Sequence, residues 1–450
     1  MISLYYIYLL AKRGKEFYNI MEKLTYSSNI PYLGEYDICV IGGGPAGVPA
    51  AIEAAREGKK VVIVESTGML GGMATAALVG PFMTCYDSKG EERVVRGIFD
   101  EIVDRTIAIE GAISPDETDA PSVYTSFLKK YHRRVTPFDS YALQLVLDRM
   151  CIEAGVELFL YTKYVDSVMK DGAIDSIVLA APEGLVALKA KLYIDCTGNA
   201  DVAAASGVET WWGSEDGMPP QPGTLFFEVD DADDEAFIGR GSRPKQPTKC
   251  YRKPIPGTYK INHYRVYGVN ANSARSMTDA HIEAREQILV SYNDLLETEG
   301  FEHCKITQVA PVLGIRESRH IVGKYRLTVN DISEGVFFDD TVVVFGYGMD
   351  VHSRDGQISG GFHGKTARKY TIPYRSLVPE GCSNLLVAGR PISAESQAAG
   401  AFRVIPGCMA MGQAAGQACA IALDAECTIG EIDTDLLRAK LREHGAIVDY

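Results

Sequence analysis

The sequence has no Cys-x-x-Cys pair, and its ten cysteines and eight histidines nowhere show the spacing of a zinc site. Ten cysteines in 450 residues are also too few for a disulfide scaffold, so we expect buried thiols in the reducing cytoplasm. Basic residues are in the minority: the formal net charge of −14 argues against nucleic acid and anionic membranes as partners. We therefore expect neither a metal centre nor a nucleic-acid interface.

A long hydrophobic run is missing as well. Residues 1–10 are apolar but too few to span a bilayer. Basic residues follow this run, whereas a signal peptide carries them before it. We expect residues 1–34 to form an N-terminal extension without a membrane anchor, in which residues 1–20 are either a docking helix or foreign to the native protein.

What the sequence does contain is a complete strand–turn–helix–strand pattern over residues 36–65. Gly42 allows a tight turn, Gly44 leaves room for a pyrophosphate against the backbone, and Gly47 lets the helix pack closely on the strands. The start of the helix offers N–H groups to phosphates, and Glu65 can accept hydrogen bonds from a ribose. The pattern favours a nucleotide-binding unit over a merely structural glycine turn.

Apolar periodicity predicts the elements that follow. We expect three long helices, over 139–154, 279–299 and 406–423. We expect strands over 156–160, 164–169, 174–180, 187–194, 258–268, 307–313, 341–346 and 384–388. Residues 211–256 hold seven of the 20 prolines and both tryptophans, which indicates the entry to a second region.

Several glycine-rich segments together resemble a known family. They are residues 42–47, 71–75, 195–198, 314–323, 389–390 and 412–416. Over roughly residues 35–425 the chain resembles the bacterial FAD-dependent oxidoreductase family of the glutathione-reductase-type FAD fold, related to fumarate-reductase flavoproteins. The resemblance implies FAD as the cofactor. It does not imply a substrate.

The order of the strands also favours FAD. A parallel sheet would be assembled from three separate stretches, residues 36–65, 156–195 and 385–388. The glycine turn that follows residue 388 can contact the ligand bound at residues 42–47 only if that ligand is long. The helix that begins near Pro406 would direct its positive end at the flavin. The residues that we expect to contact the cofactor are Gly42, Gly44, Pro45, Ala46, Gly47, Glu65, Ser66, Gly71, Gly72, Met73, Ala74, Thr75, Thr197, Gly198, Asp201, Gly389, Arg390, Gly407, Met409 and Gly412.

The expected fold class is α/β, with a discontinuous Rossmann-like FAD-binding domain and an inserted α+β substrate domain. Residues 35–210 and 385–425 would form the FAD-binding domain. Residues 211–384 would form the substrate domain, and 426–450 a C-terminal helical tail.

No second GxGxxG unit is visible, so the sequence offers no separate nicotinamide domain. The electron source or sink is then the substrate itself, a transiently bound NAD(P)H or an electron-transfer protein. We expect hydride transfer between flavin N5 and a small polar substrate, carboxylate-like or sugar-like, in a protein that is monomeric or homo-oligomeric. Since no histidine lies between residues 36 and 131, we expect noncovalent FAD.

Three residues are candidates for catalysis: Arg316, Arg319 and His352. An arginine pair suits a carboxylate, and a histidine can move the proton that accompanies a hydride. If residues 314–323 are helical, Arg316 and Arg319 share one face, and Glu317 and His320 another. The alternatives are a structural ion-pair network around Glu317 and a surface position for His352. His132 and Cys85 are weaker candidates.

Three rival functions stay open. An NAD-only dehydrogenase would leave residues 68–75 and 389–416 without a role. An RNA-directed flavoprotein of this fold conflicts with the acidic charge balance. A flavin-bearing electron-transfer subunit of a complex would hold a flavin that no small molecule reduces or reoxidises.

Overall fold

The computed structural model describes residues 27–118, 133–215, 217–235, 249–354 and 364–450. The expected N-terminal extension up to residue 26, and His132, lie outside these residues.

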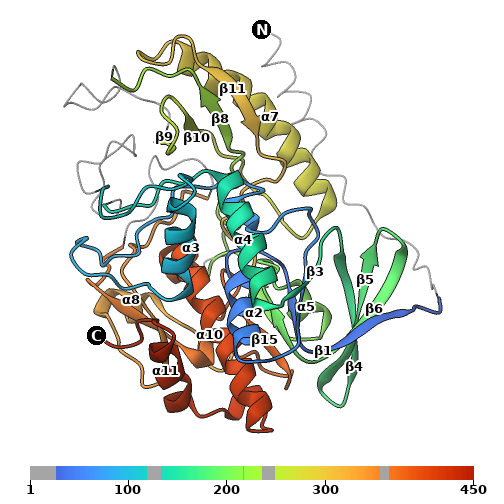
Figure 1. The fold of residues 1–450 in the computed structure, drawn as a ribbon. Coiled ribbons are helices and arrows are strands. Elements are labelled where there is room, and N and C mark those ends of the chain that lie inside the picture. Colours follow the sequence, from blue (N-terminus) through green and yellow to red (C-terminus); the bar gives the residue numbers. More distant parts are fainter. Residues whose placement is uncertain (1–26, 119–132, 216, 236–248, 355–363) are drawn as a thin grey trace.

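A seven-stranded sheet forms the centre of the fold (Figure 1). Its strands are β1 (Tyr32–Ile41), β2 (Val61–Val64), β3 (Glu157–Phe159), β4 (Lys163–Lys170), β5 (Ala173–Ala181), β6 (Gly184–Asp195) and β15 (Leu385–Val387). The order is β3-β2-β1-β6-β5-β4, with β15 paired to the end of β6. Strands β3, β2, β1, β6 and β15 run parallel, while β4, β5 and β6 form an antiparallel meander. The expected assembly from three distant stretches of chain is confirmed, but β4 and β5, within the second stretch, add an antiparallel part that the expected parallel sheet did not include.

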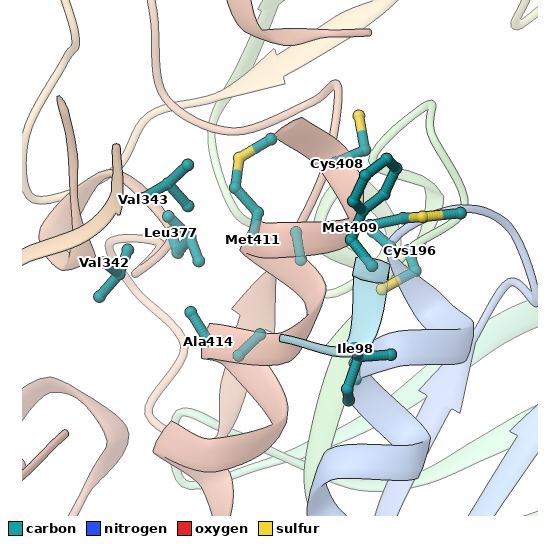
Figure 2. Close-up of a cluster of buried hydrophobic side chains, with 14 of the residues drawn as sticks. Ile98, Cys196, Val342, Val343, Leu377, Cys408, Met409, Met411 and Ala414 are labelled. Carbon is teal, nitrogen blue, oxygen red and sulfur yellow. The ribbon is translucent and has the colours of Figure 1, made fainter. Parts of the chain in front are cut away.

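Both faces of β1 are buried over residues 38–41, which explains the continuous apolar run there. Ile38 and Val40 face a core shared with the helices, and Cys39 and Ile41 face a core shared with the meander. The helices of the first core include α2 (Gly47–Arg56), α3 (Ile98–Ile107), α4 (Ser140–Ala154), α10 (Ile405–Asp424) and α11 (Thr434–Glu443). Figure 2 shows part of this core, where Met411 of α10 lies among apolar side chains.

Helices α2 and α10 approach each other so closely that glycine is required between them. A Cβ on Gly412 would lie 2.0 Å from the carbonyl oxygen of Ala46, and one on Gly416 would lie 2.2 Å from that of Ala50. Ala46 belongs to the turn between β1 and α2. The contact therefore fixes the end of the nucleotide-binding turn against α10.

We expect Gly412→Ala to lower the free energy of unfolding by about 1–3 kcal/mol, the typical cost of overpacking a rigid contact. The cause is the clash of the new Cβ with the backbone of Ala46. Thermal or urea unfolding measures the loss. Ala410→Ser, on a half-buried position of the same helix, is the control and should unfold nearly like wild type. Wild-type stability of Gly412→Ala would contradict the close contact.

A second, antiparallel sheet has its own core. Its strands are β8 (Phe227–Asp230), β9 (Lys249–Arg252), β10 (Tyr259–Asn262) and β11 (Lys305–Val309), in the order β11-β8-β10-β9. The long helix α7 (Ala274–Leu296) lies against it (Figure 1). Ala284 and Ile288 of α7 pack with Phe227, Val229 and Tyr259.

Buried charges join this second sheet to α4. Lys260 of β10 is 2% exposed and donates to Ser140 Oγ at 2.6 Å. Lys253 pairs with Glu228 at 2.5 Å and with Asp139, the N-cap of α4, at 2.8 Å. Lys260 Nζ lies 3.8 Å from the other oxygen of Glu228. The contact between sheet and helix therefore depends on a buried ionic cluster.

The remaining elements belong to neither of these two sheets. They are α5 (Asp201–Ala205), α8 (Val329–Glu334), α9 (Ser396–Phe402), the strand pair β7 (Thr210–Trp212) and β12 (Arg319–Ile321), the strand pair β13 (Thr341–Phe345) and β14 (Tyr370–Pro373), and the short 3-10 turns η1 (Gly72–Ala74), η2 (Tyr374–Ser376) and η3 (Ile429–Glu431). Strands β13 and β14 share the core of α10, so no break in packing marks residue 384, and the expected domain boundaries stay a prediction.

The helical arrangement considered for residues 314–323 does not form. These residues are a loop that runs into β12, which pairs with β7. Extended backbone sends side chains in alternate directions, so Arg316 and Arg319 are not neighbours on one helical face. In the part of the chain that the structure describes, no helix combines the length and the apolar character needed to cross a bilayer.

Candidate active site

One large cavity, of about 1090 Å³, runs between the carboxyl ends of the parallel strands and the second sheet. This is where α/β folds bind ligands, and the volume is at the upper end of the usual range for small-molecule sites. Its wall includes the β1–α2 turn, the end of β2, the β6–α5 turn, the start of α10 and part of the second sheet.

The glycines of the β1–α2 turn have different surroundings. Gly42 has a φ of +100°, and its Cβ would lie 2.5 Å from the carbonyl oxygen of Cys196. A Cβ on Gly47 would lie 1.8 Å from the carbonyl oxygen of Gly42. A Cβ on Gly44 meets only Gly72 Cα, at 4.0 Å, and Gly44 lines the cavity. Gly42 and Gly47 are thus needed by the fold, whereas Gly44 is free to face a ligand.

Glu65 is buried at the end of β2 and organises the turns around it. Its Oε2 accepts a hydrogen bond from the N–H of Gly43 at 2.9 Å. Its Oε1 accepts from the N–H of Thr67 at 2.7 Å and from Ser66 Oγ at 3.1 Å. The carboxylate therefore holds the glycine turn in place while it lines the cavity.

Hydrogen bonds to Asp195 and from Arg390 hold the β6–α5 turn in place. Buried Asp195 accepts hydrogen bonds from the N–H of Thr197 and the N–H of Ala203, both at 3.0 Å. Arg390, just after β15, donates to the carbonyl oxygen of Gly198 at 2.8 Å and to the carbonyl oxygen of Ile315. Burial lowers the pKa of Arg390 to about 10. These bonds connect three distant segments at the cavity wall.

Arg319 also lines the cavity, but its guanidinium is already engaged. It donates to the carbonyl oxygen of Asn199 at 2.8 Å and forms an ion pair with Asp201. Its neighbours therefore favour a role in holding the β6–α5 turn over one in binding substrate.

Arg316 lines the end of the cavity that adjoins the second sheet and is nearly buried. Its Nη1 donates to the carbonyl oxygen of Pro222 and to Thr224 Oγ1, both at 2.7 Å. Within the described residues it makes no ion pair. Burial lowers its pKa well below the ordinary value, and the like charges of Arg265 and Arg403 lower it further.

His352 shares that end of the cavity. Its Nε2 lies 3.5 Å from Asp350 Oδ2, and its backbone N–H donates to Gln221 Oε1 at 3.0 Å. Burial, followed by the charge of Arg316, lowers the pKa of His352 well below its usual range. With its side chain 17% exposed, it is not the surface histidine of the alternative interpretation.

Arg403 stands directly before α10 and faces Asp350. Its Nη2 donates to the backbone carbonyl of Asp350 at 2.9 Å and lies 3.9 Å from Asp350 Oδ2. Its buried Nε has no hydrogen-bond partner among the described residues. Tyr251 and Tyr347 complete this wall, and burial raises the pKa of Tyr251 to about 12.

Glu317 and His320 are not part of the cavity wall. Glu317 is 1% exposed and pairs with Arg354 at 2.9 Å, and it accepts a hydrogen bond from the N–H of Gln221 at 2.9 Å. His320 is buried and stacks on Trp211. A structural network around Glu317 does exist, but its arginine is Arg354 rather than Arg316 or Arg319.

The structure places most of the expected cofactor residues on the cavity. Those that line it are Gly42, Gly44, Pro45, Ala46, Glu65, Ser66, Gly72, Met73, Thr197, Gly198, Asp201, Gly389 and Arg390. Those that do not are Gly47, Gly71, Ala74, Thr75, Gly407, Met409 and Gly412. Gly47 and Gly412 are packing positions, Thr75 bonds the carbonyl oxygen of Leu70, and Met409 lies in the core of Figure 2.

Several polar residues at the end of the cavity that holds His352 are not among those expected from the sequence. They are Tyr251, Asn262, Tyr347, Asp350 and Arg403 on the wall, with Arg265 behind it. They come from four separate segments and share no local motif. Cys85, considered near the flavin, is buried, does not line the cavity, and has its pKa raised to about 12 by burial.

The cavity suits a long dinucleotide. The N-termini of α2 and α10 both reach it, and in the described structure no side chain caps either helix, so an anion could bind to their first N–H groups. Gly44 offers the close backbone approach that a pyrophosphate needs. The wall then continues past α10 to the polar end around His352.

Comparison with known proteins gives the family. A family model described as FAD dependent oxidoreductase matches residues 37–441. The chain is 28% identical over 193 residues to the digeranylgeranylglycerophospholipid reductase of Methanospirillum hungatei, covering 41% of this chain and 42% of that protein. It is 52% identical over 52 residues to the mitochondrial dihydrolipoyl dehydrogenase of Schizosaccharomyces pombe, covering 12% and 10%. The chain thus matches less than half the length of these two relatives.

Two solved structures are similar over most of the chain. A geranylgeranyl bacteriochlorophyll reductase-like protein of Thermoplasma acidophilum has a TM-score of 0.47 and 12% identity, covering 92% of this chain and 84% of that one. The p-nitrophenol 4-monooxygenase of Pseudomonas putida has a TM-score of 0.47 and 13% identity, covering 92% and 87%. Since the family model spans well over half of its length, this chain belongs to the FAD dependent oxidoreductase family, and its cofactor is FAD.

Proposed function

We propose that the protein transfers a hydride between FAD and a small polar substrate bound at the His352 end of the cavity. The observation that carries this proposal is the continuity of one cavity from Glu65 to His352. Its first part has the features of a dinucleotide site. Its far end adds a wall of polar side chains that the cofactor-binding turns do not require.

The chain's own residues have separable roles in this proposal. FAD, when bound, supplies the two-electron acceptor or donor. His352 moves the proton: in the oxidative direction a substrate O–H or C–H gives its proton to the neutral imidazole, and in the reductive direction the imidazolium returns it. Asp350 orients the ring from 3.5 Å. Arg319, bound to Asp201, supports the turn beside the cofactor rather than the substrate.

We expect His352→Gln to reduce turnover by on the order of 100-fold or more, because a positioned acid or base is worth about that much. The burial-lowered pKa of His352 keeps it neutral below the ordinary histidine range. The acid limb of kcat/KM in wild type should therefore lie below about pH 6.5 and disappear in the variant. Stopped-flow flavin reduction across pH measures both effects.

The exposed His303 provides the control, since His303→Gln should retain both the rate and the acid limb. Flavin content and melting temperature of His352→Gln should stay near wild type. A variant that turns over at the wild-type rate with an unchanged limb would remove His352 from the mechanism.

The substrate is identified by anaerobic bleaching of the yellow protein with hydroxy acids, sugars and enoates, with NADH and NADPH alongside. Bleaching by a small organic substrate supports direct hydride transfer. Bleaching by a nicotinamide alone assigns transient NAD(P)H as the donor. If no small molecule bleaches the flavin, an electron-transfer subunit is the better interpretation. Oligomeric state, cytoplasmic location and the relation to fumarate-reductase flavoproteins stay predictions.

A further inference from the structure

The far end of the cavity has more positive than negative charge. Arg316 and Arg403 line it, Arg265 lies behind the wall with its charge close to Arg316, and Asp350 is the acidic residue on this part of the described wall. His352, with its lowered pKa, adds no charge near neutral pH. After burial, the like charges of Arg265 and Arg403 lower the pKa of Arg316, so these charges lie close enough together to oppose one another.

The hydrogen bonds of these arginines do not neutralise them. Arg316 bonds only a backbone carbonyl and a threonine hydroxyl, so its charge has no counter-ion within the described residues. Arg265 Nη1 donates to the side-chain oxygen of Asn262 and to the backbone carbonyls of His263 and Tyr264, all of them neutral acceptors.

Arg403 is nearest to a carboxylate, but that contact is long. The 3.9 Å from its Nη2 to Asp350 Oδ2 exceeds hydrogen-bond distance, and its buried Nε is unpartnered in the described structure. A buried donor without a partner is costly, and a ligand that accepts from it recovers that cost.

We propose that this end of the cavity binds the carboxylate of a small carboxylate substrate between Arg316 and Arg403. The inference rests on the proposed function, because it names the substrate class of the same site. Planar guanidinium groups suit a carboxylate because they can donate two parallel N–H bonds to it. The carboxylate would supply the counter-charge that the described wall lacks. Uncharged sugars do not meet this requirement.

Binding to the FAD-loaded protein tests the proposal without turnover. The probes are lactate, succinate and benzoate, each compared with its uncharged amide. The readouts are the perturbation of the visible flavin band and the shift in melting temperature. We expect at least one carboxylate to bind far more tightly than its amide. No preference for any carboxylate over its amide would overturn the proposal.

Three variants localise the effect. Arg403→Gln and Arg316→Gln should each weaken binding of that carboxylate by on the order of 100-fold, as expected for loss of one partner of a buried charge pair. Asp350→Asn should instead tighten it, because it removes the opposing negative charge. A merely structural disturbance would weaken binding in all three, so that result would overturn the proposal. Arg96→Gln, at an exposed arginine 54% accessible, is the control.

The outcome separates this inference from the proposed function. Suppose that carboxylates bind through Arg316 and Arg403 without ever exchanging electrons with the flavin. That result would support the anion site and refute hydride transfer. A neutral substrate that reduces the flavin at full rate in Arg403→Gln and Arg316→Gln would refute the anion site and leave hydride transfer standing.

Discussion

Gly44→Val should yield a folded protein with no measurable FAD. The Cβ of residue 44 enters open space beside the cavity, with Gly72 Cα at 4.0 Å as its nearest neighbour, so the apoprotein accommodates it. The same side chain occupies the place where a pyrophosphate approaches the backbone. Flavin absorbance per protein measures binding. The melting temperature should match that of flavin-stripped wild type.

Gly47→Val is the matched comparison, because it lies in the same turn but has no room. Its Cβ would lie 1.8 Å from the carbonyl oxygen of Gly42, so this variant should fail to fold or melt far below the apoprotein. Normal flavin content in Gly44→Val would show that the cofactor does not follow this turn. An unfolded Gly44→Val beside a folded Gly47→Val would reverse the two assigned roles.

Loss of the buried carboxylate Glu228 should cost about 3–5 kcal/mol of unfolding free energy, the range observed when one partner of a buried ion pair is removed. Glu228→Gln removes the carboxylate beside Lys260, which is 2% exposed and keeps the hydroxyl of Ser140 and the ring of Phe138 as neighbours. It also takes a carboxylate from Lys253. Chemical denaturation measures the loss. Asp231→Asn, in the exposed pair with Lys305 on the same sheet, should change stability by no more than about 1 kcal/mol.

The same cluster predicts a pH dependence. Burial lowers the pKa of Lys260 from 10.5 to about 8, so the unfolded chain holds this proton more tightly than the folded one. The free energy of unfolding should therefore rise between about pH 8 and 10.5, by at most about 3 kcal/mol. The reason is that Lys260 loses its proton in the folded state over this range, so the folded protein no longer holds a buried charge. Lys260→Met should show no such rise. An identical pH profile in wild type and Lys260→Met would contradict the assignment.

Much of the cofactor half was predictable from the sequence, because its chemistry is local. The requirement for glycine at Gly42 and Gly47 comes from contacts within or beside one turn, and Glu65 follows at a fixed distance along a βαβ unit. Strands of near-continuous apolar residues likewise predict a buried parallel sheet. The sequence predicts a cofactor contact for Gly412. The structure instead places this glycine against the start of α2, a helix more than 350 positions earlier in the chain.

The substrate half was less predictable, because it is built from contacts between distant segments. The sequence indicates Arg316 by its charge and placement and partly by the family-like segment 314–323, but its neighbours Arg403 and Asp350 belong to unrelated stretches of sequence. Residues 314–323 have a charge spacing that would suit a helix, yet pairing of β12 with β7 makes their end extended. Tertiary contacts overrode the local pattern there, and Arg316 and Arg319 were separated as a result.

The late position of β15 has a consequence for the biogenesis of the holoenzyme. This strand pairs with β6, and Arg390 just behind it bonds the Gly198 carbonyl and Ile315 carbonyl on the cavity wall. Helix α10, which follows, supplies the last part of that wall. Because a ribosome makes the chain in order, the cavity wall stays incomplete until β15 and the start of α10 have emerged. A chain that stalls before α10 would therefore lack part of its FAD site.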